Sequence, residues 1–323
     1  MKGIFTNANE GRLRAGWRIL FFLFLFWIGA ATIFVVKPLL GDISKKAFLG
    51  DYSLLIVAIL AITASIAVPI ARKYLDKKSF VSLGLKIDAH TFKDLFFGFF
   101  LSAAMAGLFY LLAISLGLIE YQGINFQLSS SVQGFNFVTF MKVLSWGSLL
   151  LLLLEHILVG YWEELFFRGY LLQNMAEGMG WIKAIVISCL IYGIVHASNP
   201  NASLISSSII VLFGFLRIYG YLSSQMLWLS IGMHIGWNFF QGPIFGFAAS
   251  GHQNATLIQH SLVSEKAWLS GGEFGPEGSI LIIPIILLAM YAMKLYTRKR
   301  PGIQIRPQNK NIENTPEIQP FSR

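Results

Sequence analysis

Residues 161–170 read YWEELFFRGY, which places two adjacent carboxylates and an arginine among tryptophan, phenylalanine and leucine. Buried charges mean different things in a soluble core and in a membrane, so the class of the protein has to be decided first. The 323-residue chain is 55% hydrophobic and 13% charged, with a mean hydropathy of +0.63. Average soluble proteins are less apolar and carry about 25% charged residues. We therefore predict an integral membrane protein.

Apolar runs long enough to cross a bilayer recur along nearly the whole chain. A helix of about 20 residues spans a hydrocarbon core of roughly 30 Å. These runs predict eight membrane helices, at residues 17–39, 52–72, 94–118, 144–174, 181–198, 204–221, 225–247 and 279–296. The predicted fold is all-α, with residues 1–300 forming a single polytopic membrane domain. The polar residues 301–323 are predicted to be a disordered cytoplasmic tail.

The basic residues predict which side of the membrane each loop occupies, because Lys and Arg are retained in the cytoplasm. With both termini cytoplasmic, most of the 25 Lys and Arg residues fall in cytoplasmic segments. The opposite segments then carry Lys37, Lys45, Lys46, Lys142 and Lys266. We attribute the net charge of +9 mostly to topology and expect no nucleic-acid partner. The lone Cys189 excludes an internal disulfide and a cysteine-rich metal site.

Polar side chains cluster on three of the predicted helices. At membrane depth such groups are costly, so by default they face a protein interior or a water-filled cavity. Each helix carries an i, i+4 pair, and residues so spaced share a helix face. The pairs are Glu164 with Arg168, Tyr192 with His196, and His234 with Asn238. By helix rise, Glu163 and the two histidines lie roughly 16 to 22 Å from the cytoplasmic ends, so one polar intramembrane cavity can collect them.

The two adjacent glutamates are predicted to have different roles. Neighbouring residues on a helix point about 100° apart. Glu164 precedes Arg168 by one turn, the favourable order for an ion pair in which the two charges neutralise each other. Glu163 is then left to face the cavity, where the loss of bulk water makes a carboxylate a better base near neutral pH.

The predicted cavity suits the activation of water. Glu163 and His196 can hold and deprotonate a water molecule. His234 and Asn238 can donate hydrogen bonds to the oxyanion that forms when this water attacks a carbonyl group. These residues predict a peptide-bond hydrolase that uses no covalent nucleophile.

Three motifs, in this order on separate predicted helices, resemble the CPBP family. They are Glu163-Glu164-x-x-x-Arg168, an aromatic residue followed four residues later by His196, and His234-x-x-x-Asn238. The family contains type II CAAX prenyl endopeptidases, such as the Ras-converting enzyme, and bacterial proteins linked to bacteriocin processing and self-immunity. The resemblance covers about residues 144–247, the expected protease core. The stretches GRLRAGWRILFF and WLSGGEFGPEGS also look like bacterial members, so we expect a bacterial plasma membrane and doubt a prenylated substrate.

The resemblance implies catalytic roles for four residues. Glu163 matches the glutamate that activates water, and His196 matches its histidine partner. His234 and Asn238 match the pair that stabilises the oxyanion. The resemblance thus implies an intramembrane endopeptidase acting on a peptide or protein that enters from the membrane or from the cytoplasmic side.

The resemblance also implies supporting residues. Glu164 and Arg168 match a supporting pair in the family. Tyr192 departs from the family, which more often has Phe at this position. A tyrosine keeps the packing of the ring and adds a hydroxyl group near His196.

We expect no metal cofactor. Glu163, His196 and His234 could together ligate zinc and leave an open position for water. The chain lacks H-E-x-x-H spacing, however, and these ligands would come from three different helices. The resemblance favours a metal-free glutamate protease.

Two other functions fit the same polar residues. In a catalytically inactive membrane scaffold or bacteriocin-immunity factor, these residues would only hold helices together or bind a partner. In a transporter, the buried carboxylates would relay protons, but we find no paired broken helices in corresponding halves of the chain. Among the other histidines, His156 is expected to line or support the cavity, and the remaining three, His90, His252 and His260, to lie in solvated loops.

Overall fold

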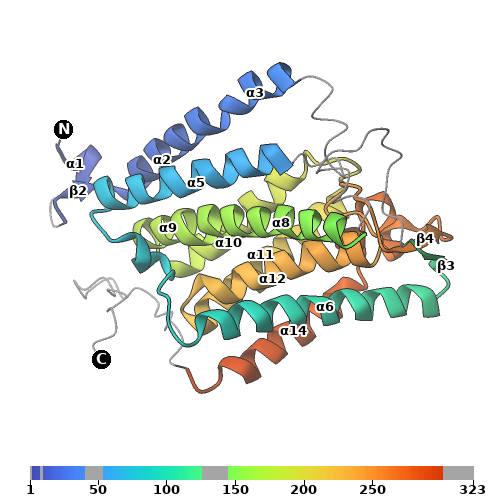
Figure 1. Cartoon of the computed structure of the whole chain (residues 1–323). Coiled ribbons are helices and arrows are strands. Elements are labelled where there is room, and N and C mark those ends of the chain that lie inside the picture. The colour runs from blue at the N-terminus through green and yellow to red at the C-terminus, as the bar shows by residue number, and fades with distance from the viewer. Residues whose placement is uncertain (1, 8–9, 41–53, 126–144, 301–323) are drawn as a thin grey trace.

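The computed structural model describes residues 2–7, 10–40, 54–125 and 145–300 of the chain. The fold is mostly helical, with two small antiparallel sheets of two strands each (Figure 1). The all-α prediction is therefore right for the bulk of the described residues and omitted these sheets. The predicted tail at residues 301–323 lies outside the described residues.

The α-helices follow the chain as α1 Lys2–Phe5, α2 Ala15–Ala30, α3 Thr32–Leu40, α5 Leu54–Tyr74, α6 Thr91–Ser115, α8 Ser145–Glu164, α9 Leu172–Met179, α10 Trp181–His196, α11 Leu204–Ser224, α12 Leu227–Phe239, α13 Ala267–Ser270 and α14 Ile282–Thr297. Two π-helical segments, η2 Leu165–Leu171 and η3 Phe240–Ile244, continue α8 and α12. Short 3₁₀ turns are η1 Phe80–Leu83, η4 Gly272–Phe274 and η5 Pro276–Gly278. The sheets pair β1 Thr6–Asn7 with β2 Arg12–Leu13 and β3 Ile119–Ile124 with β4 Ile258–Leu262.

Four helical stretches of the described chain are long and apolar enough to cross a membrane. They are Ala15–Val36, Leu54–Tyr74, Thr91–Ser115 and Leu204–Ser224. Two further apolar helices, α10 and α14, have 16 residues each. The structure thus agrees with a membrane protein and places a helix within each of the eight predicted ranges, whereas eight spans remain a prediction.

Helix α12 lies at the centre of the fold. Its side chains reach both core clusters, with Ile231 and Ile235 in one and Met233 and Trp237 in the other. A helix that is apolar on all sides is suited to this buried position.

Glycines let α12 approach its neighbours closely. A Cβ atom on Gly232 would lie 2.2 Å from the backbone oxygen of Leu95 in α6. On the other side, a Cβ on Gly160 of α8 would lie 3.0 Å from the backbone nitrogen of Ile235. Small residues at such crossings allow helices in membranes to pack backbone against backbone. This packing brings the polar face of α12 next to the end of α8.

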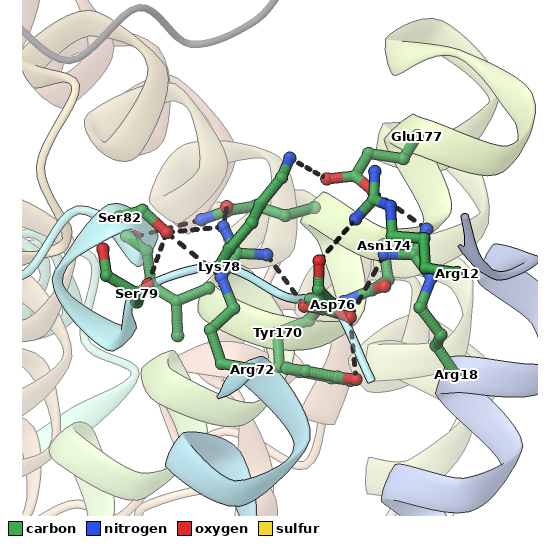
Figure 2. Close-up of polar contacts among 12 residues, drawn as sticks. Arg12, Arg18, Arg72, Asp76, Lys78, Ser79, Ser82, Tyr170, Asn174 and Glu177 are labelled. Atoms are coloured by element: carbon green, nitrogen blue, oxygen red, sulfur yellow. Dashed lines mark hydrogen bonds and ion pairs between the residues drawn. The ribbon is translucent and has the colours of Figure 1, made fainter. Parts of the chain in front are cut away.

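Helix α1 and strand β2 lie at one end of the bundle and the β3–β4 sheet at the opposite end (Figure 1). At the N-terminal end, a group of polar residues surrounds Asp76, which follows α5 (Figure 2). We call this group the Asp76 cluster; its members are Arg12, Arg18, Arg72, Asp76, Lys78, Tyr170, Asn174 and Glu177. The cluster ties the N-terminal segment and α5 to η2 and α9.

Candidate active site

The first predicted motif lies where α8 changes its helical geometry. Glu163 and Glu164 end α8, and the π-helical segment η2 begins at the next residue. In η2 the amide of Leu172 donates to the oxygen of Phe167, five residues earlier. A π-turn adds a residue to the helical repeat and is frequent at functional sites. The structure is helical over nearly all of the predicted range 144–174, and the π-helical segment within it was not predicted.

The carboxylate of Glu164 is fully buried and surrounded by donors. Arg168 Nη1 lies 3.1 Å and His234 Nδ1 2.9 Å from Glu164 Oε1, and the Ser230 hydroxyl donates to Glu164 Oε2 at 2.5 Å. Arg217 Nε lies 4.0 Å from Glu164 Oε1. The predicted ion pair with Arg168 is therefore present, and a serine and a histidine from α12 complete the set of donors.

Glu163 has a different environment. Its Oε2 atom accepts a hydrogen bond from the Tyr192 hydroxyl at 2.9 Å, and His234 Nε2 lies 3.8 Å from the same oxygen. Glu163 also lines a cavity. The two adjacent glutamates thus point to different partners, as their positions on the helix predicted.

The tautomers of the two histidines follow from their partners. His196 Nδ1 lies 2.8 Å from the backbone oxygen of Tyr192. Since a carbonyl oxygen only accepts, Nδ1 carries a hydrogen and Nε2 is the acceptor in the neutral ring. His234 Nδ1 faces the Glu164 carboxylate in the same way. In the neutral ring, His234 Nε2 is likewise an acceptor, and it becomes a donor only when the ring carries a second proton.

The cavity has a volume of about 30 Å³, which is room for a water molecule. Its lining contains all four residues predicted to be catalytic, which come from three helices: Glu163, His196, His234 and Asn238. Tyr192 and Arg217 also line the cavity. The lining also includes His156, as expected of a pore-lining residue. The structure therefore brings the three motifs to one place.

Accessibility varies along the cavity. Tyr192, Arg217 and His234 are buried, whereas His196 and Asn238, near the last residues of α10 and α12, are partly exposed. The loop after η3 completes the lining with Ala249, Ser250, His252 and Asn254. The cavity is therefore closed around Arg217 and more accessible toward the loop.

The expectation that three histidines lie in solvated loops was right for His90, which is exposed. It was wrong for His252, which lines the cavity, and for His260, which is partly buried in β4 with its ring 4.5 Å from that of Phe247. The spacing of residues within a loop does not indicate which of them fold back onto a helix bundle.

The predicted set of site residues did not include Arg217, Ser230 or Glu277. Arg217 interrupts the apolar run LFGFLRIYGY, and this charge in a predicted span was a signal that could have found it. Ser230 lies four residues before His234 and shares its helix face. Glu277 gives no comparable signal, because it lies in a loop that folds back onto α12.

Glu277 is buried and attaches the loop wall of the cavity to α12. Trp237 Nε1 donates to Glu277 Oε1 at 2.8 Å, and the Ser250 hydroxyl donates to Glu277 Oε2. Trp237 precedes Asn238 in the chain, and Ser250 lines the cavity. The carboxylate therefore fixes the position of the loop relative to the end of α12 that carries Asn238.

The described side chains do not fit a metal site. No three His, Cys, Asp or Glu residues in the described part of the chain are grouped so that they can hold a metal ion. We derive no step through a metal.

Comparison with protein families matches residues 145–240 to the type II CAAX prenyl endopeptidase Rce1-like family. These residues form an Rce1-like domain. The match covers α8 to α12 and supports the resemblance to the CPBP family that the motifs indicated. Comparison with curated proteins gives no match. At the level of the family, the Rce1-like domain indicates a CAAX-type intramembrane peptidase.

Proposed function

We propose that the protein is an intramembrane endopeptidase in which Glu163 activates water for the hydrolysis of a peptide bond. The observation that carries this proposal is the contrast between the two adjacent carboxylates. Glu164 is surrounded by Arg168, Ser230 and His234, whereas Glu163 has a tyrosine hydroxyl on one side and a water-sized cavity on the other. A carboxylate held in this way can accept a proton from a water molecule in the cavity.

The remaining lining residues complete the reaction. His196 Nε2 is an acceptor and helps Glu163 to hold the water. The water oxygen attacks the peptide carbonyl carbon while its proton moves to Glu163. The Asn238 amide donates to the oxyanion, as does His234 Nε2 when the ring is doubly protonated. When the C–N bond breaks, the proton on Glu163 passes to the leaving amine.

The substrate that we propose is a peptide or protein at the membrane. The Rce1-like domain contains apolar helices that expose large side chains such as Ile194, Leu204 and Leu150, consistent with a bilayer around it. We further propose a plasma membrane location with both termini in the cytoplasm. The partly exposed His196 and Asn238 favour substrate entry from the end of the cavity that borders the loop.

The test compares purified wild type with Glu163→Gln on a library of lipidated and unlipidated peptides. Equal thermal unfolding of the two proteins shows that both are folded. We expect cleavage by the wild type and none above background by Glu163→Gln. Cleavage by neither protein, or equally by both, would contradict the protease and support the inactive scaffold or immunity factor. Full activity with a chelator present would argue against zinc.

A further inference from the structure

Arg217 is a buried cation on a helix that supplies no predicted catalytic residue. It lies in α11 and is 2% exposed. Its Nη1 atom donates a hydrogen bond to the hydroxyl of Tyr192, and its Cζ atom lies 5.5 Å from the centre of the Tyr192 ring. The same hydroxyl donates to Glu163 Oε2 at 2.9 Å. Arg217, Tyr192 and Glu163 thus form a chain of two hydrogen bonds that ends at the carboxylate facing the cavity.

We propose that Arg217 is a positioning residue for Glu163 and acts through Tyr192; this inference rests on the proposed function. A tyrosine hydroxyl has a single hydrogen. Because Arg217 can only donate, it occupies one lone pair of the hydroxyl and leaves the hydroxyl hydrogen to be donated to Glu163. The guanidinium charge also polarises the hydroxyl and strengthens its bond to the carboxylate. Glu163 is thereby held in one orientation, with its accepting face toward the cavity.

The two arginines near Tyr192 have different partners. Arg168 Cζ lies 4.3 Å from the centre of the Tyr192 ring, but its Nη1 atom donates to Glu164. Arg217 approaches Glu164 only to 4.0 Å and donates to the Tyr192 hydroxyl instead. Arg168 therefore pairs with the buried Glu164, and Arg217 is linked through Tyr192 to Glu163 at the cavity.

Both hydrogen bonds depend on the hydroxyl group of Tyr192. A phenylalanine would fill the same space but leave Glu163 without this donor and the buried Arg217 Nη1 without this acceptor. An unmatched buried donor or charge is destabilising. Tyr192 and Arg217 are therefore a matched pair, and each needs the other to hold Glu163.

The experiment measures kcat, KM and melting temperature for Arg217→Met, Arg217→Lys, Tyr192→Phe and the double variant Tyr192→Phe/Arg217→Met. We expect kcat to fall about 10-fold to 100-fold in each Met or Phe single variant while KM changes little, because a misplaced base slows the chemical step. The double variant should lose about as much kcat as one single variant, since both residues act through the same pair of hydrogen bonds to Glu163. Arg217→Lys keeps a donor and should recover part of kcat.

Matched controls separate positioning from stability. Arg72→Met removes a buried arginine of the Asp76 cluster, and Tyr221→Phe removes a buried hydroxyl from α11. Both controls should keep kcat, whatever their melting temperatures. If Arg217→Met does not fold, Tyr192→Phe decides alone: a lowered kcat at unchanged KM supports the inference, and an unchanged kcat overturns it.

The outcomes also separate this inference from the proposed function. If the wild type cleaves no peptide, or Glu163→Gln cleaves as well as the wild type, the proposed function fails. If the wild type cleaves, Glu163→Gln does not, and Arg217→Met retains kcat, then only the role of Arg217 is overturned. Losses that multiply in the double variant would likewise show that Arg217 and Tyr192 act independently.

Discussion

Among the described residues, buried arginines pair with buried carboxylates in two places, and the two places differ in how completely the charges are paired. In the Asp76 cluster, each oxygen of Asp76 accepts two hydrogen bonds, from Arg18 and Tyr170 on one side and from Arg72 and Asn174 on the other (Figure 2). In the cavity, the carboxylate of Glu163 has one hydrogen-bond donor from a side chain, Tyr192, among the described residues.

This difference shows that buried charge by itself does not identify an active site. Asp76 is a structural anchor, because its hydrogen-bonding capacity is used up and nothing remains for a substrate or water. Glu163 borders an open volume and lies near two histidines whose Nε2 atoms can accept protons. The carboxylate with a single side-chain donor among the described residues, the cavity beside it and the neighbouring histidines together distinguish the candidate active site.

The largest expected effect tests the cavity side of the comparison. Glu163→Gln keeps the shape of the side chain but removes the base, so kcat should fall by about 10² to 10⁴. The melting temperature should change little, because Tyr192 can still donate to an amide oxygen. Peptide cleavage and thermal unfolding on the same samples check this. Activity of Glu163→Gln within a few-fold of wild type would show that Glu163 is not the base and has only a structural role, like Asp76.

The next effect tests the Asp76 cluster. Asp76→Asn leaves Arg18 and Arg72 without their buried countercharge, and breaking a buried ion pair in this way costs about 3 to 5 kcal/mol of folding free energy. We expect a large fall in melting temperature and unchanged kcat per folded molecule. A specific loss of kcat in protein that remains folded would show that this cluster takes part in catalysis.

A matched pair of asparagines gives the third test. Asn238→Ala removes the proposed donor to the oxyanion. Loss of such a donor typically lowers kcat by about 10² to 10³, and we expect kcat to fall by about 10² while KM stays nearly unchanged. Asn174→Ala removes a donor to Asp76 and should lower the melting temperature without changing kcat. Enzyme kinetics and thermal unfolding of both variants check this. A loss of kcat in Asn174→Ala, or a loss of stability alone in Asn238→Ala, would contradict the assignment of the two regions.

The smallest effect is a pH dependence at the edge of the Asp76 cluster. Burial opposes ionisation of Glu177, but the hydrogen bond from Lys78 and the charges of Lys78, Arg18 and Arg12 lower its pKa from 4.5 to about 2. A lowered folded-state pKa means that the ion pairs stabilise the fold above about pH 4.5 and are lost as the pH falls toward 2.

The melting temperatures of wild type and Glu177→Gln in detergent should therefore differ at pH 6 and converge as the pH is lowered from about 4.5. A difference that stays constant over this range would mean that Glu177 acts through its shape and not through its charge.

Much of the candidate site could be predicted from residue spacing. Pairs such as Glu164 with Arg168 lie on one helix, and the regular repeat of the helix sets their distance. The contact of Glu164 with His234 could not be predicted in the same way, because it depends on how closely α8 and α12 pack. The interpretation of His252 as solvated failed for a similar reason, since a loop returns to the cavity.

The sequence by itself determined the membrane class, the resemblance of residues 145–240 to the Rce1-like family and the helices that carry the polar motifs, because apolar length and helical spacing are local properties of a chain. Only the tertiary structure decided that Ser230 and His234 from α12 complete the donors around Glu164, and that Arg217 reaches Glu163 through Tyr192. Those contacts join separate helices, and close packing at residues such as Gly160, where α8 meets α12, allows the short distances between them.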